Sequence, residues 1–231
     1  MKKYACIFFD LDHTLWDFEA NSAETLEVLF HQHRLREKGI SSFPFFIETF
    51  VRVNTYLWDL HDRGLIGPHV IREERFHRVL SEAGLDDYRL SQKISEEYLD
   101  ALPHKKSLIP EALETLEYLF PKYPMVIVTN GFDELQSTKM KSAGIKDYFR
   151  HVVTSQRAGN RKPSKEIFEF ALNESGFNPS QSIMIGDNLL TDIVGARSAG
   201  LDTIYFNPAG KTHDEQVTHE ITRLNELRTL L

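Results

Sequence analysis

The stretch IFFDLDHTLW, residues 7 to 16, places an apolar run directly before two aspartates that stand two positions apart. The run Tyr4 to Phe9 is typical of a buried strand, so Asp10 and Asp12 follow the end of that strand. Two carboxylates this close repel each other, and burial makes the repulsion worse. The pair therefore predicts a compensating cation or a shared proton, which the rest of the chain has to supply.

Four further apolar runs predict buried strands, and helical patterns alternate with them. The predicted strands are Met125 to Thr129, His151 to Thr154, Ile183 to Ile185 and Thr203 to Phe206. The predicted helices are Pro110 to Phe120, Phe132 to Ala143, Ser164 to Ser175 and Thr191 to Ala199, and glycines directly follow the last three. This alternation predicts an α/β fold built on a doubly wound, Rossmann-like parallel sheet.

The first two predicted strands are too far apart for a single connecting helix. A βαβ unit needs about 30 residues, whereas far more separate Phe9 from Met125. The intervening sequence has apolar residues at helical spacing, most clearly Phe46, Phe50, Val53, Leu57 and Leu60. Residues 17–105 therefore predict an all-helical domain inserted into an α/β core of residues 1–16 and 106–231. The insertion begins at the carboxyl end of the first strand, where such sheets bind ligands, so it is placed to cover that site.

Charge and cysteine content exclude some classes of protein. A formal net charge of −7 over 231 residues argues against a chain that neutralises nucleic acid or an anionic membrane. The single cysteine, Cys6, cannot form an internal disulfide, which fits a reducing compartment. The N-terminal apolar run is short and ends in an acid, so it predicts neither a secretory signal nor a membrane span. We therefore expect a cytoplasmic protein.

Four short motifs follow predicted strands or open a predicted helix. They are Asp10-Leu11-Asp12-His13-Thr14, Thr129-Asn130-Gly131, Lys162-Pro163-Ser164 and Gly186-Asp187 with Asp192 shortly after it. Each alone is also an ordinary cap, turn or solvated loop. In a doubly wound sheet they converge on one crevice, where carboxylates, a lysine and a hydroxyl meet. Such a cluster is stable around a hard dication, and carboxylate oxygens are the ligands that magnesium prefers.

Taken together, these motifs resemble the haloacid dehalogenase superfamily in type and order, and the insertion lies where that superfamily carries a helical cap. The resemblance covers nearly the whole chain. It implies that Asp10 is the nucleophile that forms an aspartyl-phosphate, and that Asp12 protonates the leaving oxygen and then activates water. It also implies that Thr129 and Asn130 bind the phosphoryl group and that the Lys162 cation offsets its charge.

The resemblance also implies a magnesium site. Asp10, the backbone carbonyl of Asp12 and the Asp187 carboxylate match the metal ligands of the superfamily. Asp192 resembles a further acidic partner that acts through metal-bound water or by orienting Lys162, and the sequence leaves both roles open. Thr14 is expected to support the loop.

Asp12 bears on the type of reaction. Dehalogenases of the superfamily lack an acid at the matching position because a halide needs no proton, whereas an alkoxide leaving group does. The sequence therefore favours hydrolysis of a phosphate ester. Three stretches resemble the pyrimidine 5'-nucleotidase subgroup of this superfamily: VNTYLWDLHDRGLI, VTNGFDELQ and KPSKEIFEFAL. This resemblance implies that the substrate is a nucleoside monophosphate.

Three alternatives remain open from the sequence. The core motifs are equally compatible with a phosphatase acting on phosphoglycolate or a sugar phosphate, and with a phosphomutase. A phospho-accepting module without turnover is disfavoured, because it needs neither the acid Asp12 nor a large lid. The sequence does not fix the oligomeric state.

Overall fold

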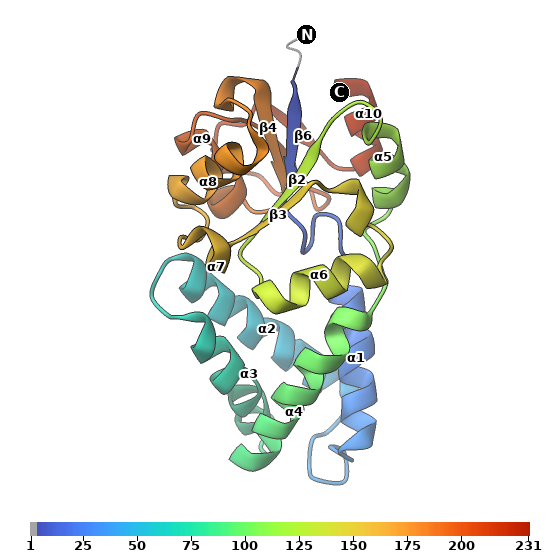
Figure 1. Ribbon diagram of the computed structural model, residues 1–231. Coiled ribbons are helices and arrows are strands. Elements are labelled where there is room, and N and C mark those ends of the chain that lie inside the picture. The colour runs from blue at the N-terminus through green and yellow to red at the C-terminus, as the bar shows by residue number, and fades with distance from the viewer. Residues whose placement is uncertain (1–3) are drawn as a thin grey trace. The chain divides into compact units, whose positions relative to one another are not determined.

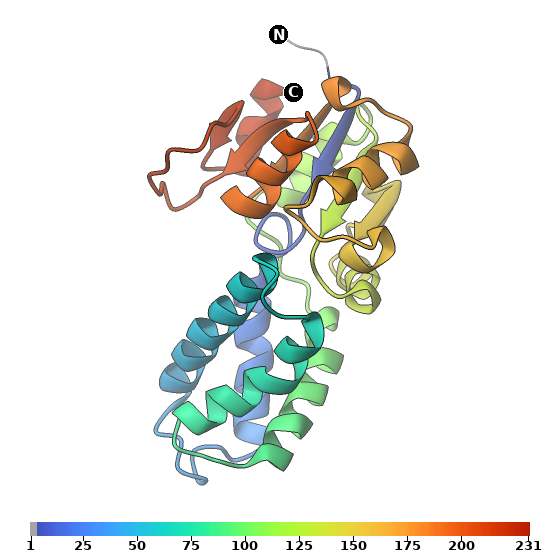
Figure 2. The same ribbon diagram turned by 90° about the vertical axis from the view of Figure 1, so that its left-hand side faces the viewer.

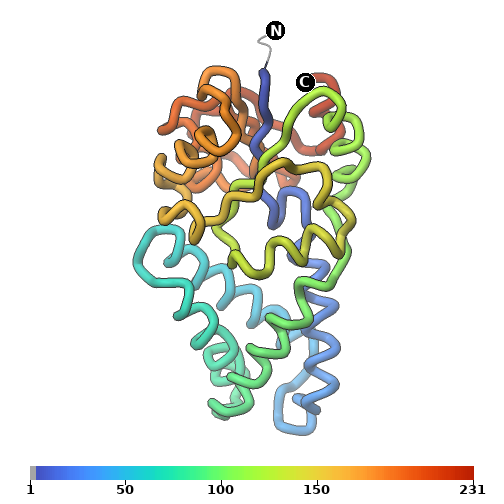
Figure 3. Tube along the Cα trace, in the orientation of Figure 1, coloured from blue at the N-terminus to red at the C-terminus, as the bar shows by residue number. Residues whose placement is uncertain are grey.

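The computed structural model describes residues 4–231, which divide into two compact units. One unit holds the chain up to Phe18 together with Lys106–Leu231, and the other holds Glu19–Lys105. The trace in Figure 3 shows the chain leaving the first unit soon after its first strand and returning to it in the green stretch. The first unit is α/β, and the second is entirely helical within the described residues.

A six-stranded, all-parallel sheet forms the centre of the α/β unit. Its strands are β1 (Cys6–Phe9), β2 (Met125–Thr129), β3 (His151–Thr154), β4 (Ser182–Gly186), β5 (Asp202–Phe206) and β6 (His219–Ile221). Their order is β3-β2-β1-β4-β5-β6, so the chain builds outward from β1 first in one direction and then in the other. The predicted doubly wound parallel sheet is therefore confirmed.

The central strands are buried on both faces, which explains their continuous apolar sequence. On one face, Cys6 and Phe8 of β1 pack with Val126 and Val128 of β2 and with Phe168 of a neighbouring helix. Phe9 at the end of β1 pairs with Ile127 and Ile185, so the ends of β1, β2 and β4 lie within two residues of one another. Polar residues that follow these strands therefore emerge at the same edge of the sheet.

Helices cover both faces of the sheet. They are α5 (Ala112–Leu119), α6 (Asp133–Ser142), α7 (Ser155–Ala158), α8 (Lys165–Ser175), α9 (Gly195–Ser198) and α10 (Leu227–Leu230), with short 3-10 turns η2 (Lys146–Tyr148), η3 (Pro179–Gln181) and η5 (Leu224–Glu226). Figure 1 shows α8 and α9 on one side of the sheet and α5 and α10 on the other.

The strand β6 and the helix after β4 differ from the sequence-based expectation. The edge strand β6 was not predicted, because its three residues are mostly polar and exposed. The helix predicted over Thr191 to Ala199 is instead a π-helix, η4 (Leu189–Val194), followed by the single turn α9. Asn188 O accepts hydrogen bonds from the N–H groups of both Asp192 and Ile193, which widens this turn. Such turns are frequent at functional sites.

The helical unit contains α1 (Phe18–Gln32), α2 (Phe43–Asp62), α3 (Pro68–Glu82), α4 (Tyr88–Ala101) and the turn η1 (Leu102–His104). Figure 2 shows its four long helices packed beside one another. Phe46 and Phe50 of α2, Phe76 of α3 and Tyr98 of α4 are buried at its centre, as the helical spacing of the apolar residues requires. The predicted helical insertion is confirmed.

Within residues 4–231, none of the helices combines the length and the apolar character that crossing a membrane requires.

Candidate active site

The predicted motif residues of the α/β unit meet at the carboxyl edge of the sheet. Asp10 follows β1, Thr129 ends β2 and Asp187 follows β4. From β1 the chain adds β2 and β3 on one side and then β4, β5 and β6 on the other. The strand order therefore reverses between β1 and β4, and the site lies at the carboxyl ends of these two strands. Open α/β sheets bind ligands in the crevice at that point. A hydrogen bond of 2.9 Å from Asp10 N to Ile185 O ties the end of β1 to β4.

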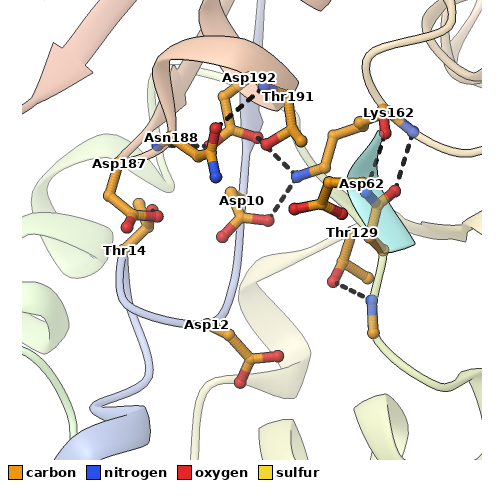
Figure 4. Close-up of polar contacts among 12 residues, drawn as sticks. Asp10, Asp12, Thr14, Asp62, Thr129, Lys162, Asp187, Asn188, Thr191 and Asp192 are labelled. Atoms are coloured by element: carbon orange, nitrogen blue, oxygen red, sulfur yellow. Dashed lines mark hydrogen bonds and ion pairs between the residues drawn. The ribbon is translucent and has the colours of Figure 1, made fainter. Parts of the chain in front are cut away.

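Lys162 is the cation at the centre of the site. Its Nζ lies 2.5 Å from Asp10 Oδ1 and 2.6 Å from Asp192 Oδ1 (Figure 4). Lys162 is 2% exposed, and Asp192 and Asp10 are also buried, at 1% and 7% exposure. An isolated charge at this depth would be very costly, so the three side chains depend on one another. The compensating cation that the paired aspartates require is therefore provided in part by Lys162.

Negative charge still exceeds positive charge at this site. Burial raises the pKa of the Asp10 carboxyl well above its ordinary range; Lys162 opposes the rise, and Asp192 and Asp187 add to it. Burial and the neighbouring Asp192 raise the pKa of Asp187 to about 7. Burial alone would lower the pKa of Lys162, but the carboxylates of Asp10 and Asp192 raise it above its ordinary value. The positive charge of one lysine does not balance the negative charge of three carboxylates. The site is therefore suited to binding a further cation.

The donor set fits a divalent metal ion. Asp10, Asp187 and Asp192 each offer a carboxylate oxygen, and these oxygens all lie within 4.8 Å of one another. Hard oxygen ligands of this kind suit Mg²⁺, which usually binds one or two carboxylates and keeps its remaining positions for water and substrate phosphate. The Asp12 carboxylate lies apart from this group (Figure 4), so only its backbone could join the ligand set.

The π-helix η4 holds Asp192 in place. Asp192 Oδ2 accepts a hydrogen bond of 3.0 Å from Asn188 N, while its Oδ1 faces Lys162. The carboxylate also packs against the end of β4, where a Cβ on Gly186 would overlap it. Glycine at position 186 is therefore required by the close approach of Asp192. Both carboxylate oxygens of Asp192 are engaged by the protein.

A tight loop connects β1 to the first helix and carries Asp12 and Thr14. His13 adopts a left-handed conformation with φ 66°, and Leu15 N and Trp16 N both donate to Leu11 O. The fully buried Thr14 donates from its hydroxyl to Asp187 Oδ1 over 3.2 Å, which links this loop to the end of β4. Thr14 thus contacts an expected metal ligand as well as supporting the loop.

Thr129 lies on the side of Asp10 opposite Asp187 (Figure 4), and Asn130 follows it in the chain. The Thr129 hydroxyl accepts a hydrogen bond from Gly131 N, and a hydroxyl in that role still has a proton to donate. The Asn130 side chain accepts from Lys162 N over 2.8 Å and donates to Lys162 O over 3.0 Å. Asn130 therefore holds the backbone of Lys162, a contact that the sequence did not indicate.

The partner of Asp12 was likewise not predicted from the sequence. Lys139 of α6 places its Nζ 2.6 Å from Asp12 Oδ1 and 2.9 Å from Oδ2. Lys139 is 4% exposed, although it lies in the polar segment Ser137-Thr-Lys-Met-Lys141, which reads as a solvated helix face. No local signal separates Lys139 from the exposed Lys141, because only packing against the β1 loop distinguishes them.

Comparisons with known proteins show which family the chain resembles. The model of the haloacid dehalogenase-like hydrolase family matches residues 4–200. The protein YfnB of Bacillus subtilis is 30% identical, over 100% of this chain and 97% of its own. The crystal structure of YfnB bound to magnesium has a TM-score of 0.89 and 29% identity, with 99% of both chains covered.

Two further relatives carry the name pyrimidine 5'-nucleotidase. YjjG of Escherichia coli is 30% identical, over 99% of this chain and 98% of its own. PynA of Streptococcus pneumoniae is 29% identical, over 97% of this chain and 93% of its own.

Proposed function

The chain belongs to the haloacid dehalogenase-like hydrolases, and we propose that it is a magnesium-dependent phosphatase that releases phosphate from pyrimidine nucleoside monophosphates. The observation that carries the proposal is the buried group of Asp10, Lys162 and Asp192 beside Asp187 at the carboxyl edge of the sheet. A nucleophilic carboxylate, a fixed cation and a set of metal-binding oxygens are the parts that transfer of a phosphoryl group requires.

Asp10 is the proposed nucleophile. Its carboxylate oxygen attacks phosphorus, the ester O–P bond breaks, and an aspartyl-phosphate forms on Asp10. Asp12 gives a proton to the departing ester oxygen and then takes one from the water that cleaves the aspartyl-phosphate, so its protonation state is restored after each turnover. The Thr129 hydroxyl and the Lys162 ammonium stabilise the phosphoryl oxygens during both transfers.

The proposed metal ligands are Asp10, Asp187 and the backbone carbonyl of Asp12. When bound, Mg²⁺ would offset the charge on the phosphoryl oxygens and lower the repulsion between them and the carboxylates. Asp192 is also near this position, but its two oxygens face Lys162 and Asn188 N. Of its two possible roles, we therefore propose that Asp192 orients Lys162.

The names of YjjG and PynA support pyrimidine nucleotides as the substrates, because both relatives match nearly the whole chain, including the helical unit. We propose that residues 17–105 form the cap and that 1–16 with 106–231 form the catalytic core. Stacking of the base on an aromatic side chain of the cap would provide selectivity. The free, buried thiol of Cys6 is consistent with the proposed cytoplasmic location.

The proposal is tested by measuring phosphate release, with Mg²⁺ or with EDTA, from UMP, dUMP, dTMP, purine monophosphates, phosphoglycolate and sugar phosphates. We expect Mg²⁺-dependent release with the highest kcat/KM on pyrimidine monophosphates. Asp10→Asn should abolish it, whereas the matched control Asp214→Asn, at an exposed position, should not. A preference for phosphoglycolate or sugar phosphates would reject the substrate and keep the chemistry. The absence of turnover on every ester would reject the phosphatase itself.

A further inference from the structure

The contact between Lys139 and Asp12 joins two segments of the α/β unit that lie far apart in the sequence. Asp12 lies on the loop after β1, and Lys139 lies in the last turns of α6. The Nζ of Lys139 contacts both carboxylate oxygens of Asp12, at 2.6 and 2.9 Å, so it fixes the plane of the carboxyl group as well as its position. A single-point contact would leave the carboxyl group able to rotate.

Aromatic rings confine the Lys139 ammonium. It lies 4.5 Å from the centre of the Trp16 ring and 5.9 Å from that of Phe18, distances at which a cation is attracted to a ring face. The Lys139 side chain is 5% exposed, whereas that of Asp12 is 22% exposed. The lysine is therefore the fixed member of the pair, and the carboxylate is the member that a substrate can reach.

We infer that Lys139 is a positioning residue that holds the Asp12 carboxyl group in the orientation from which it exchanges protons during the reaction. The inference rests on the proposed phosphatase function. In the first step the Asp12 proton moves to the ester oxygen as the O–P bond breaks and the bond from Asp10 to phosphorus forms. In the second step the Asp12 carboxylate takes a proton from water as the aspartyl-phosphate is cleaved. Lys139 keeps its own protons in both steps.

Two physical effects support this role. Proton transfer requires the carboxyl oxygen to lie within hydrogen-bond reach of the leaving oxygen, and a misplacement of about 1 Å can lower a rate about 100-fold. In addition, negative charge develops on Asp12 as its proton leaves, and a buried ammonium at 2.6 Å stabilises that charge. The Lys162 ammonium contacts Asp10 and Asp192, so it does not perform this task for Asp12.

A purely structural role for Lys139 makes a different prediction. If Asp12 only neutralised a buried lysine, replacing Lys139 would affect all substrates to the same extent. If Lys139 positions a proton donor, the loss depends on how much the leaving group needs a proton. A nucleoside monophosphate releases a basic alkoxide, whereas p-nitrophenyl phosphate releases an anion that is stable without a proton.

The experiment compares kcat/KM for UMP and p-nitrophenyl phosphate, because this ratio reports the steps up to release of the first leaving group. Lys139→Met removes the charge and keeps most of the side-chain volume. Lys139→Arg restores a cation, and Lys141→Met makes the same change at an exposed position of the same helix. Circular dichroism and thermal unfolding establish that each variant is folded.

We expect Lys139→Met to lower kcat/KM for UMP about 100-fold and for p-nitrophenyl phosphate only a few-fold. Lys139→Arg should recover most of the loss on UMP, and Lys141→Met should equal the wild type.

An equal loss on both esters, or no loss on either, would overturn the inference and leave the phosphatase proposal intact. If the wild type hydrolyses neither ester with Mg²⁺, the proposed function fails and this inference fails with it. If Lys139→Met does not fold, the same comparison of kcat/KM for UMP and p-nitrophenyl phosphate is made with Lys139→Gln, with the same expected and contradicting results.

Discussion

The Nζ of Lys162 lies 2.6 Å from Oδ1 of Asp192, and both side chains are almost completely buried. The same ammonium contacts Asp10, so one cation lies between the carboxylate that follows β1 and the carboxylate of η4. Lys162 is in turn held through its backbone by Asn130. The position of the proposed nucleophile therefore depends on residues from three other segments of the chain.

Replacing Lys162 by methionine should destabilise the protein, because it leaves the carboxylates of Asp10, Asp187 and Asp192 without their cation. Loss of one partner of a buried ion pair costs about 3–5 kcal/mol, which corresponds to a fall in Tm of roughly 10 °C for a chain of this size. Added Mg²⁺ should raise the Tm of Lys162→Met more than that of the wild type, since the metal replaces the lost charge. Thermal unfolding in EDTA and in Mg²⁺ measures both effects.

The control for that experiment is Lys165→Met, which removes an exposed lysine close to Lys162 in sequence. We expect its Tm to match the wild type in EDTA and in Mg²⁺. Equal Mg²⁺ effects on Lys162→Met and on the wild type would show that the metal does not bind beside Lys162.

Replacing Thr14 by valine should weaken metal binding. The hydroxyl that donates to Asp187 Oδ1 is lost while the shape of the side chain is kept. Partners that orient metal ligands typically affect metal affinity by about 10- to 100-fold, so we expect the Mg²⁺ concentration for half-maximal activity to rise at least about 10-fold. Thr115→Val is the matched control, because the Thr115 hydroxyl is buried without a hydrogen-bond partner. An unchanged Mg²⁺ requirement in Thr14→Val would contradict the assignment of Asp187 as a metal ligand.

Replacing Asn130 by alanine should lower kcat. The N–H and C=O groups of Lys162 both lose their side-chain partner, and the lysine is no longer held against Asp10. We expect a loss of stability of about 1–3 kcal/mol and a fall in kcat of about 10- to 100-fold. Steady-state kinetics and urea unfolding measure the two effects, with the exposed Asn173→Ala as the control. A normal kcat in Asn130→Ala would show that Lys162 keeps its position without this contact.

The thiol of Cys6 should be unreactive in the folded protein. Burial raises the pKa of Cys6 from its ordinary value to about 12, so almost no thiolate is present at pH 8. We expect the disulfide reagent DTNB to modify Cys6 rapidly in denaturant and very slowly in native buffer. Because the folded state retains the thiol proton longer than the unfolded state, this group lowers stability as pH rises from about 9. Rapid labelling of native protein at pH 8 would contradict the burial of β1.

The sequence was sufficient to identify the strands that carry the site. β2 and β3 have the bounds expected from their apolar runs. The signal is strongest for β2, because a strand buried on both faces is almost continuously apolar. The three-residue strand β6 and the π-helix η4 were not predicted, for two different reasons. β6 is an exposed edge strand with little apolar signal, and η4 is set by hydrogen bonds to Asn188 that the helical spacing of apolar residues does not reveal.

By itself, the sequence determined the parallel sheet, the helical insertion and the motif residues that follow the strands, since apolar periodicity and the position of polar residues relative to it are local properties of the chain. Only the tertiary structure decided which lysines meet which carboxylates. Lys139 and Lys141 are two residues apart on α6, yet one is buried against Asp12 and the other is exposed. The physical reason is that burial of a charge depends on a partner supplied by another segment of the chain, and the sequence around the lysine does not encode that partner.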